Sequence, residues 1–316
     1  MFIKNCQFGN RMFTFTKNEL EIFRAVCLEN KSVSDIVEST APSSKTVYRL
    51  VETIEKDGLV RKQGERGARF APSTDLHAVA LKKYVLSDGR PLDAIVGSRL
   101  LVLLSISNFP KGIKRIAKET KLKQETVRVL IWSLRTYGIV MQEGSKIKIS
   151  PTDTFMIQFL QDFSRGANLK IMEEKTKVGA MLWSDGLEFI FSAPSLSDPV
   201  GVKKTGITAM AEYGLDFISE TNYYYYAYWH PDLKVEDVAI HNLLIGPNSV
   251  RNISYSILLL KKTGYDRRYL TKEARCVGIN KLVREVLDIA EGKEVANPFL
   301  PSKMDMESLY AQYGVP

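Results

Sequence analysis

Cysteine and histidine are scarce in this chain, with three residues of each among 316. Cys6, Cys27 and Cys276 are an odd number at unrelated spacings, which excludes a disulfide framework and a cysteine-based zinc motif. We therefore expect a reducing compartment and a cytoplasmic protein. The N-terminus lacks the apolar run of a signal peptide, and the most apolar stretch, residues 100–106, is too short to span a bilayer. No membrane partner is expected.

The motifs that usually carry enzyme chemistry are also missing. No Gly-x-Ser-x-Gly, Walker loop or His-Glu-x-x-His occurs, and no Gly-Ser turn precedes an Asp-x-Asp or Asp-x-Glu strand that could hold Mg²⁺. We expect no catalytic residue, no cofactor and no metal site, and His241 is read as a structural histidine on an apolar strand. One enzymatic alternative is a nuclease-like core of Asp232 with Glu291 and Lys293. It is disfavoured because Glu291 follows the end of a predicted helix.

What the chain does contain is an internal repeat. Residues 31–60 align with residues 111–140 without a gap, and eight of the 30 positions are identical, where about two are expected from ordinary composition. Each copy predicts a short helix, a tight turn, a longer helix, a glycine and an extended hairpin. This order is typical of a helix-turn-helix followed by a wing, and two copies suggest a protein that reads DNA.

The elements of each copy follow from local signals. A Thr16-x-x-Glu19 capping box begins the first helix of copy 1, and residues 76–86 form a connecting helix between the copies. The other helices of the repeat are predicted over residues 31–40 and from about 43 to Gly58 in copy 1, and over residues 100–106, 112–120 and 124–137 in copy 2.

Beyond about residue 165 the pattern changes to mixed strands and helices. A hairpin is predicted over residues 180–183 and 187–192. Residues 223–229 and 238–245 are read as extended. Helices are expected over residues 208–213, 249–262, 280–290 and 302–313. The apolar pattern of residues 249–262 fits the period of a strand as well as that of a helix. The aromatic run Tyr223–Trp229 is expected to place one face in a core, with the other at a core or subunit contact rather than on nucleic-acid bases.

The sequence thus predicts an α+β protein with two tandem winged helix-turn-helix domains and a mixed α/β C-terminal domain. The first winged-helix domain is assigned to residues 1–75, and the linker helix with the second domain to residues 76–151. Residues 165–316 are assigned to a domain for dimerisation, sensing or partner binding.

Positive charge is concentrated in the second copy. Residues 76–150 carry a net +9, whereas residues 1–75 carry +2 and residues 151–316 carry −3. A basic surface attracts polyanions such as double-stranded DNA. Six cations lie close together on the second helix and the following turn, opposed only by Glu119, and we expect all six to face the phosphate backbone. They are Lys111, Lys114, Arg115, Lys118, Lys121 and Lys123.

The outward faces of the two third helices are the predicted reading surfaces, because the opposite stripe is apolar. Arginine and lysine can bind phosphates or guanine, and glutamine can pair with adenine. The predicted DNA-binding residues are Ser44, Lys45, Tyr48 and Arg49 in copy 1, Gln124 and Arg128 in copy 2 (with Trp132 as a further candidate), Lys114, Lys118, Lys121 and Lys123 beside them, and Arg66, Arg69 and Lys146 in the wings.

The blocks TVYRLVETIEKDGLVRK and TVRVLIWSLRTYGIV resemble the winged-helix domains of bacterial and archaeal transcriptional regulators. The resemblance covers residues 16–72 and 92–151 and implies that fold and DNA binding. The stretch TGITAMAEYGL, residues 205–215, is similar to the AbiEi-type antitoxin and regulator families, in which a winged helix precedes a nucleotidyltransferase-related domain without metal carboxylates. Two winged helices in tandem depart from the simplest members of those families.

Three hypotheses follow. The first is a DNA-binding transcriptional regulator whose C-terminal domain dimerises or senses a signal. The second is an antitoxin-like module that grips and neutralises a partner enzyme through residues 165–316. The third is a nucleic-acid enzyme, which the missing motifs disfavour.

Overall fold

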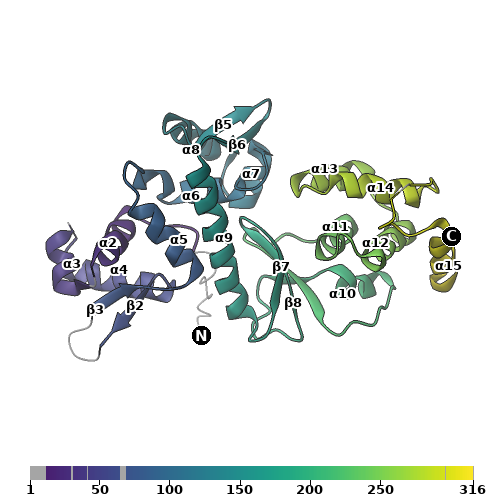
Figure 1. Ribbon diagram of the computed structural model, residues 1–316, viewed down its shortest axis with the longest axis horizontal. Coiled ribbons are helices and arrows are strands. Elements are labelled where there is room, and N and C mark those ends of the chain that lie inside the picture. Colours follow the sequence, from purple (N-terminus) through teal and green to yellow (C-terminus); the bar gives the residue numbers. More distant parts are fainter. Residues whose placement is uncertain (1–11, 30, 41, 65–68, 296, 316) are drawn as a thin grey trace. The chain divides into compact units, whose positions relative to one another are not determined.

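The computed structural model describes residues 12–29, 31–40, 42–64, 69–295 and 297–315. The chain divides into two compact units, Met1–Ile171 and Met172–Pro316 (Figure 1). The N-terminal unit holds two helix-plus-hairpin modules, and the C-terminal unit holds a four-stranded sheet with helices. The α+β class with tandem winged-helix units is therefore confirmed. Arg66 and Cys6 lie outside the described residues.

The first winged-helix unit is built by the three helices and the hairpin that the sequence predicts. Capping boxes at Thr16 and Ser32 begin its first two helices, because each hydroxyl accepts from the backbone N–H three residues later while that residue's carboxylate binds back. A three-stranded antiparallel sheet has the order β1-β3-β2. The elements are α2 (Lys17–Leu28), β1 (Lys31–Ser32), α3 (Val33–Ser39), α4 (Ser44–Lys56), β2 (Val60–Gln63) and β3 (Arg69–Pro72).

The second winged-helix unit repeats this arrangement. Its sheet has the equivalent order β4-β6-β5, and α8 spans the positions that align with α4 in the repeat. Lys31 pairs with Phe70 in one sheet and Lys111 with Ile147 in the other. The elements are η1 (Leu92–Ile95), α6 (Ser98–Ser105), β4 (Lys111–Gly112), α7 (Ile113–Thr120), α8 (Gln124–Thr136), β5 (Val140–Glu143) and β6 (Lys146–Ile149). The repeat in sequence is therefore a repeat in structure.

A helix follows each wing: α5 (Leu76–Val85) after the first and α9 (Thr154–Lys175) after the second. The sequence predicts α5 but not α9, whose apolar pattern is interrupted by Gly166 and the buried Asn168. The rings of Tyr84 and Phe159 lie 4.6 Å apart, and Phe163 contacts Phe15 of the first unit. A Cβ at Gly166 would lie 2.2 Å from the backbone nitrogen of His77. Only glycine lets the two backbones approach this closely.

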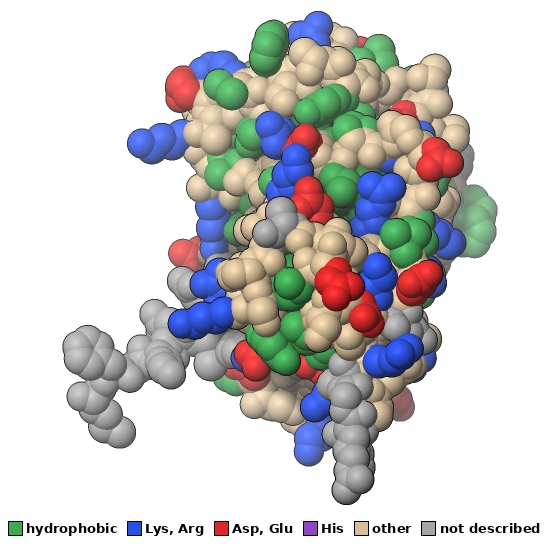
Figure 2. Space-filling view, turned by 90° about the vertical axis from the view of Figure 1, so that its left-hand side faces the viewer, with side chains coloured by type: hydrophobic (Ala, Val, Ile, Leu, Met, Phe, Trp, Pro, Cys, Tyr) green, Lys and Arg blue, Asp and Glu red, His purple; other side chains and the backbone are tan. Residues whose placement is uncertain are grey.

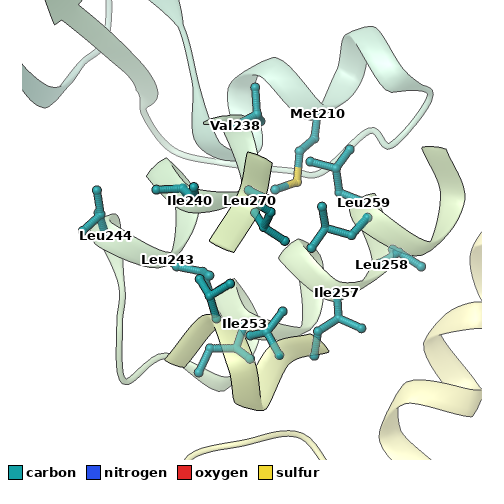
Figure 3. Close-up of a cluster of buried hydrophobic side chains, with 14 of the residues drawn as sticks. Met210, Val238, Ile240, Leu243, Leu244, Ile253, Ile257, Leu258, Leu259 and Leu270 are labelled. Carbon is teal, nitrogen blue, oxygen red and sulfur yellow. The ribbon is translucent and has the colours of Figure 1, made fainter. Parts of the chain in front are cut away.

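The C-terminal unit begins with an antiparallel sheet of order β7-β8-β10-β9. Its strands are β7 (Ala180–Asp185), β8 (Glu188–Ala193), β9 (Val202–Lys204) and β10 (Asn222–Ala227). Its helices are α10 (Gly206–Met210), η2 (Ala211–Tyr213), α11 (Val235–Ile245), α12 (Val250–Thr263), α13 (Arg267–Cys276), α14 (Asn280–Ala290) and α15 (Lys303–Tyr313). Figure 3 shows their shared core, where α11 and α12 meet through Leu243 and Ile253.

The expectation that residues 238–245 are extended is wrong, because they form the body of α11. This helix is buried on nearly all sides, so its apolar run has no helical period, and a short apolar run of this kind cannot be told from a buried strand. The predicted aromatic strand does form β10. Tyr224 and Tyr226 lie on one face, Tyr225 on the other, and all three are buried.

No helix in the described part of the chain combines the length and the hydropathy that a bilayer crossing needs.

Candidate nucleic-acid interface

The helix α4 separates an apolar from a polar face, as its sequence predicts. Val47, Leu50, Val51 and Ile54 are buried at the spacing of one helical stripe. Ser44, Lys45, Tyr48 and Arg49 are exposed on the other side. Because the buried stripe fixes the rotation of the helix about its axis, these four side chains can reach a ligand without any rearrangement of the core.

The helix α8 is fixed in the same way by Val127, Ile131 and Leu134, all buried. At its first turn Gln124 is half-buried, and Arg128 is exposed one turn later. The Arg128 guanidinium donates to the Glu125 carboxylate at 2.6 Å. Both side chains are more than half exposed, so this pair contributes little stability and opens at low cost.

Four lysines beside α8 are exposed, namely Lys114 and Lys118 on α7 and Lys121 and Lys123 in the turn. Lys121 adopts the left-handed conformation at φ 57° that ends α7. Partial burial lowers the pKa of its ammonium below the ordinary lysine value. These four side chains form a cationic group around the start of α8, which we call the α7 lysine group.

The other two cations of the basic run turn inward, which corrects the expectation that all six face phosphates. The Lys111 side chain is 2% exposed and its ammonium lies 3.0 Å from Glu119 Oε2. Arg115 also binds the Glu119 carboxylate. Ser105 Oγ donates to Glu119 as well, at 2.7 Å. Charge counts along a sequence cannot reveal this, because they do not show which side of a short helix each cation occupies.

Burial by itself raises the pKa of Glu119. The charges of Lys111 and Arg115 and the hydrogen bonds from Arg115 and Ser105 outweigh that effect and hold the pKa below its usual value. Glu119 is therefore ionised at neutral pH and fixes both cations inside the second unit. In the first unit the aligned residue is Ser39 and Lys31 is only half-buried, so the first copy has no equivalent of this cluster.

The two wings differ in length and in charge. In the first, Arg61 and Lys62 on β2 and Arg69 on β3 are exposed, whereas the tip with Arg66 lies outside the described residues. In the second, only Gly144 and Ser145 separate β5 from β6. Lys146 is exposed there, while the Lys148 ammonium binds Glu143 at 2.8 Å. Figure 1 places the two hairpins far apart within the N-terminal unit, β2–β3 at lower left and β5–β6 at the top.

Charge is interspersed on the one face that Figure 2 shows. Figure 2 shows Lys and Arg side chains among acidic and hydrophobic ones on the side of the molecule that lies at the left of Figure 1. Two exposed apolar residues of α8, Val129 and Trp132, lie on the N-terminal unit. Val129 is not among the predicted DNA-binding residues, although it aligns with the predicted residue Arg49 of the first copy.

His241, Asp232 and Glu291 of the C-terminal unit each have a structural partner. His241 on α11 is buried, its Nδ1 lies 2.8 Å from Thr205 Oγ1, and its ring packs on Tyr225. Burial lowers the pKa of His241 to about 3, so the ring is neutral. Asp232 pairs with Lys203, and Glu291, at the C-terminal end of α14, binds Arg267 and Lys293. Within the described residues no three His, Cys, Asp or Glu side chains are grouped as a metal site.

The comparisons with known proteins identify one part of the chain. Residues 201–315 match the family model described as HVO_2833_C, C-terminal. The match runs from the loop before β9 through α15, and so lies within the C-terminal unit. Comparison with curated proteins and with solved structures gave no match. The resemblance to AbiEi-type proteins stays a prediction.

Proposed function

We propose that this chain is a sequence-specific DNA-binding transcription regulator that acts by binding rather than by catalysis. One observation carries the proposal: α4 and α8, at aligned positions of the repeat, each bury an apolar stripe and expose the opposite face at the position of a recognition helix. The major groove of B-DNA is wide enough to admit such a helix. The exposed Arg49 and the half-buried Gln124 carry the donors that bind guanine and adenine edges.

The surroundings of the two helices support the same conclusion. The α7 lysine group flanks the start of α8, where phosphates lie when a recognition helix enters the groove. Arg69 and Lys146 extend from the hairpins at the sides of the helices. Phosphate contacts of this kind fix the register of a protein on the duplex, while contacts from α4 and α8 select the sequence.

The C-terminal unit is assigned the second task of such a regulator, which is dimerisation, sensing or binding of a partner protein. Its sheet and helices form a separate core, and its sequence carries a net negative charge. A surface of that sign does not attract a polyanion. We therefore place DNA contact in the N-terminal unit alone.

The test uses the full-length chain and a random duplex library, from which bound sequences are selected and read. We expect a defined motif. Dissociation constants for that motif are then measured across salt concentrations. Because each phosphate contact contributes about 0.9 to the slope of log K against log salt, replacing Lys114, Lys118, Lys121 and Lys123 by alanine should reduce the slope by about 3.6.

A matched control removes four exposed lysines of the C-terminal unit, Lys204, Lys272, Lys281 and Lys303. It makes the same change in net charge and should leave the slope nearly unchanged. Equal loss in both variants would mean that net charge alone drives binding. Recovery of no common motif from the library would overturn the proposal of specific DNA binding.

A further inference from the structure

The two recognition helices differ in character at two aligned exposed positions. Arg49 and Glu52 of α4 correspond, in the second copy, to Val129 and Trp132 of α8. Val129 is 66% exposed and Trp132 is 70% exposed. Copy 1 thus presents charge where copy 2 presents apolar surface, in a helix of the same length and rotation.

Val129 and Trp132 are not part of the core of their own unit. They are three residues apart, so their side chains are neighbours on one face of α8. The core of the unit is filled from the opposite face by Val127, Ile131 and Leu134. A large side chain such as Trp132 in water is unfavourable, so an adjacent exposed pair calls for a partner that covers it.

Charge near the pair indicates what that partner is. The α7 lysine group is exposed beside the start of α8, and Arg128 lies next to Val129. On α8 itself only Glu125 carries a negative charge, and Arg128 neutralises it. An apolar pair framed by cations is complementary to a polyanion that also displays apolar groups. In the major groove those groups are the C5-methyls of thymine.

Resting on the DNA-binding function proposed above, we propose that α8 reads thymine methyl groups through Val129 and Trp132. Gln124, at the start of the same helix, pairs with the neighbouring adenine. The second copy therefore selects an A·T-rich segment, whereas the first, with Arg49 and Lys45 at its surface, selects guanine. The operator consists of two unlike half-sites, one for each winged helix.

The test removes methyl groups from the DNA, which leaves the protein intact. Deoxyuridine replaces thymine in one half-site at a time of the selected duplex, and full-length chain is titrated against each version. Each lost methyl contact should weaken binding about fourfold in the A·T-rich half-site and have little effect in the other. The single variants Trp132→Ala and Val129→Ala should each show a smaller methyl effect, and the double variant Val129→Ala/Trp132→Ala should bind thymine and deoxyuridine duplexes nearly equally. Arg49→Ala should keep the full methyl effect.

Trp132 gives a second readout in a Trp183→Phe/Trp229→Phe background of the full-length chain, where it is the single remaining tryptophan. Acrylamide quenching of its fluorescence should fall when the selected duplex binds. If the chain binds its motif but deoxyuridine substitution changes nothing, the inference is overturned while the proposed function stands. If Trp132→Ala binds the motif as tightly as the parent chain, the apolar pair belongs to a protein contact instead. Failure to bind any duplex would overturn both proposals.

Discussion

The buried cluster around Glu119 gives the sharpest stability prediction. The variant Glu119→Gln removes the negative charge but keeps the size and hydrogen-bonding oxygen of the side chain. The Lys111 side chain, which is 2% exposed, then loses the carboxylate that lies 3.0 Å from its ammonium. Arg115 loses its carboxylate partner as well, although its side chain is 16% exposed and closer to water.

The expected loss follows from the depth of burial. Removing one partner of a buried ion pair costs about 3–5 kcal/mol, because the other charge stays desolvated. A unit of this size melts about 2–4 °C lower for each kcal/mol lost, so the transition of the N-terminal unit should fall by roughly 6–20 °C. The control Glu125→Gln breaks an ion pair of the same unit whose side chains are 79% and 54% exposed. It should cost less than about 1 kcal/mol.

Calorimetry of the full chain measures both variants, and pH supplies a second test. Because the folded-state pKa of Glu119 is below its usual value, its contribution is complete above the unfolded-state pKa and is lost as the pH falls through the folded-state pKa. The parent chain should therefore lose stability in acid more steeply than Glu119→Gln does. The double variant Lys111→Met/Glu119→Leu should recover much of the loss. Equal, small effects of Glu119→Gln and Glu125→Gln would refute the assignment.

Three further predictions concern packing and titration. Gly166→Ala places a Cβ 2.2 Å from the His77 backbone nitrogen and should cost about 3 kcal/mol in urea denaturation, whereas its exposed neighbour Arg165→Ala should have almost no effect. Burial raises the pKa of Cys27 to about 12. Peptide mapping after iodoacetamide treatment at pH 8 should therefore find Cys27 protected and Cys276 modified. Equal modification of both cysteines would contradict the buried position of Cys27. Burial lowers the pKa of His241 to about 3, so below about pH 6.5 the unfolded chain binds a proton at this ring that the folded chain excludes. The C-terminal unit should therefore lose stability as the pH drops from about 6.5 towards 3. His241→Gln should flatten that part of the curve of stability against pH, and an unaltered curve would count against a neutral buried ring.

The sequence predicts the winged-helix units well because their signals are local and occur twice. The Thr16 capping box, an apolar stripe and a glycine after the long helix all agree in the first copy. The second copy repeats the stripe and the glycine at the aligned positions. Where an element is buried on all sides, these signals vanish. The prediction of an extended segment at residues 238–245 is wrong for that reason, since α11 shows no polar face.

The candidate interface is predictable only in part. Periodicity gives the outward positions of α4 and α8, and all four predicted residues of α4 are exposed. It gives no information on tertiary pairing, so the sequence groups Lys111 and Arg115 with the exposed lysines although Glu119 holds both. The sequence does not predict the long helix α9, because Gly166, which the close approach to His77 requires, interrupts the apolar pattern.

The central claim is tested most directly by the ratio of two dissociation constants at physiological salt, for the selected duplex and for a scrambled duplex of the same composition. Specific DNA-binding proteins bind their sites about 10³-fold or more tightly than other sequences. We predict a ratio of that order for the full-length chain and a ratio reduced about 5- to 150-fold in Arg49→Ala, which corresponds to the loss of one base contact. A ratio near one for the parent chain would contradict the account.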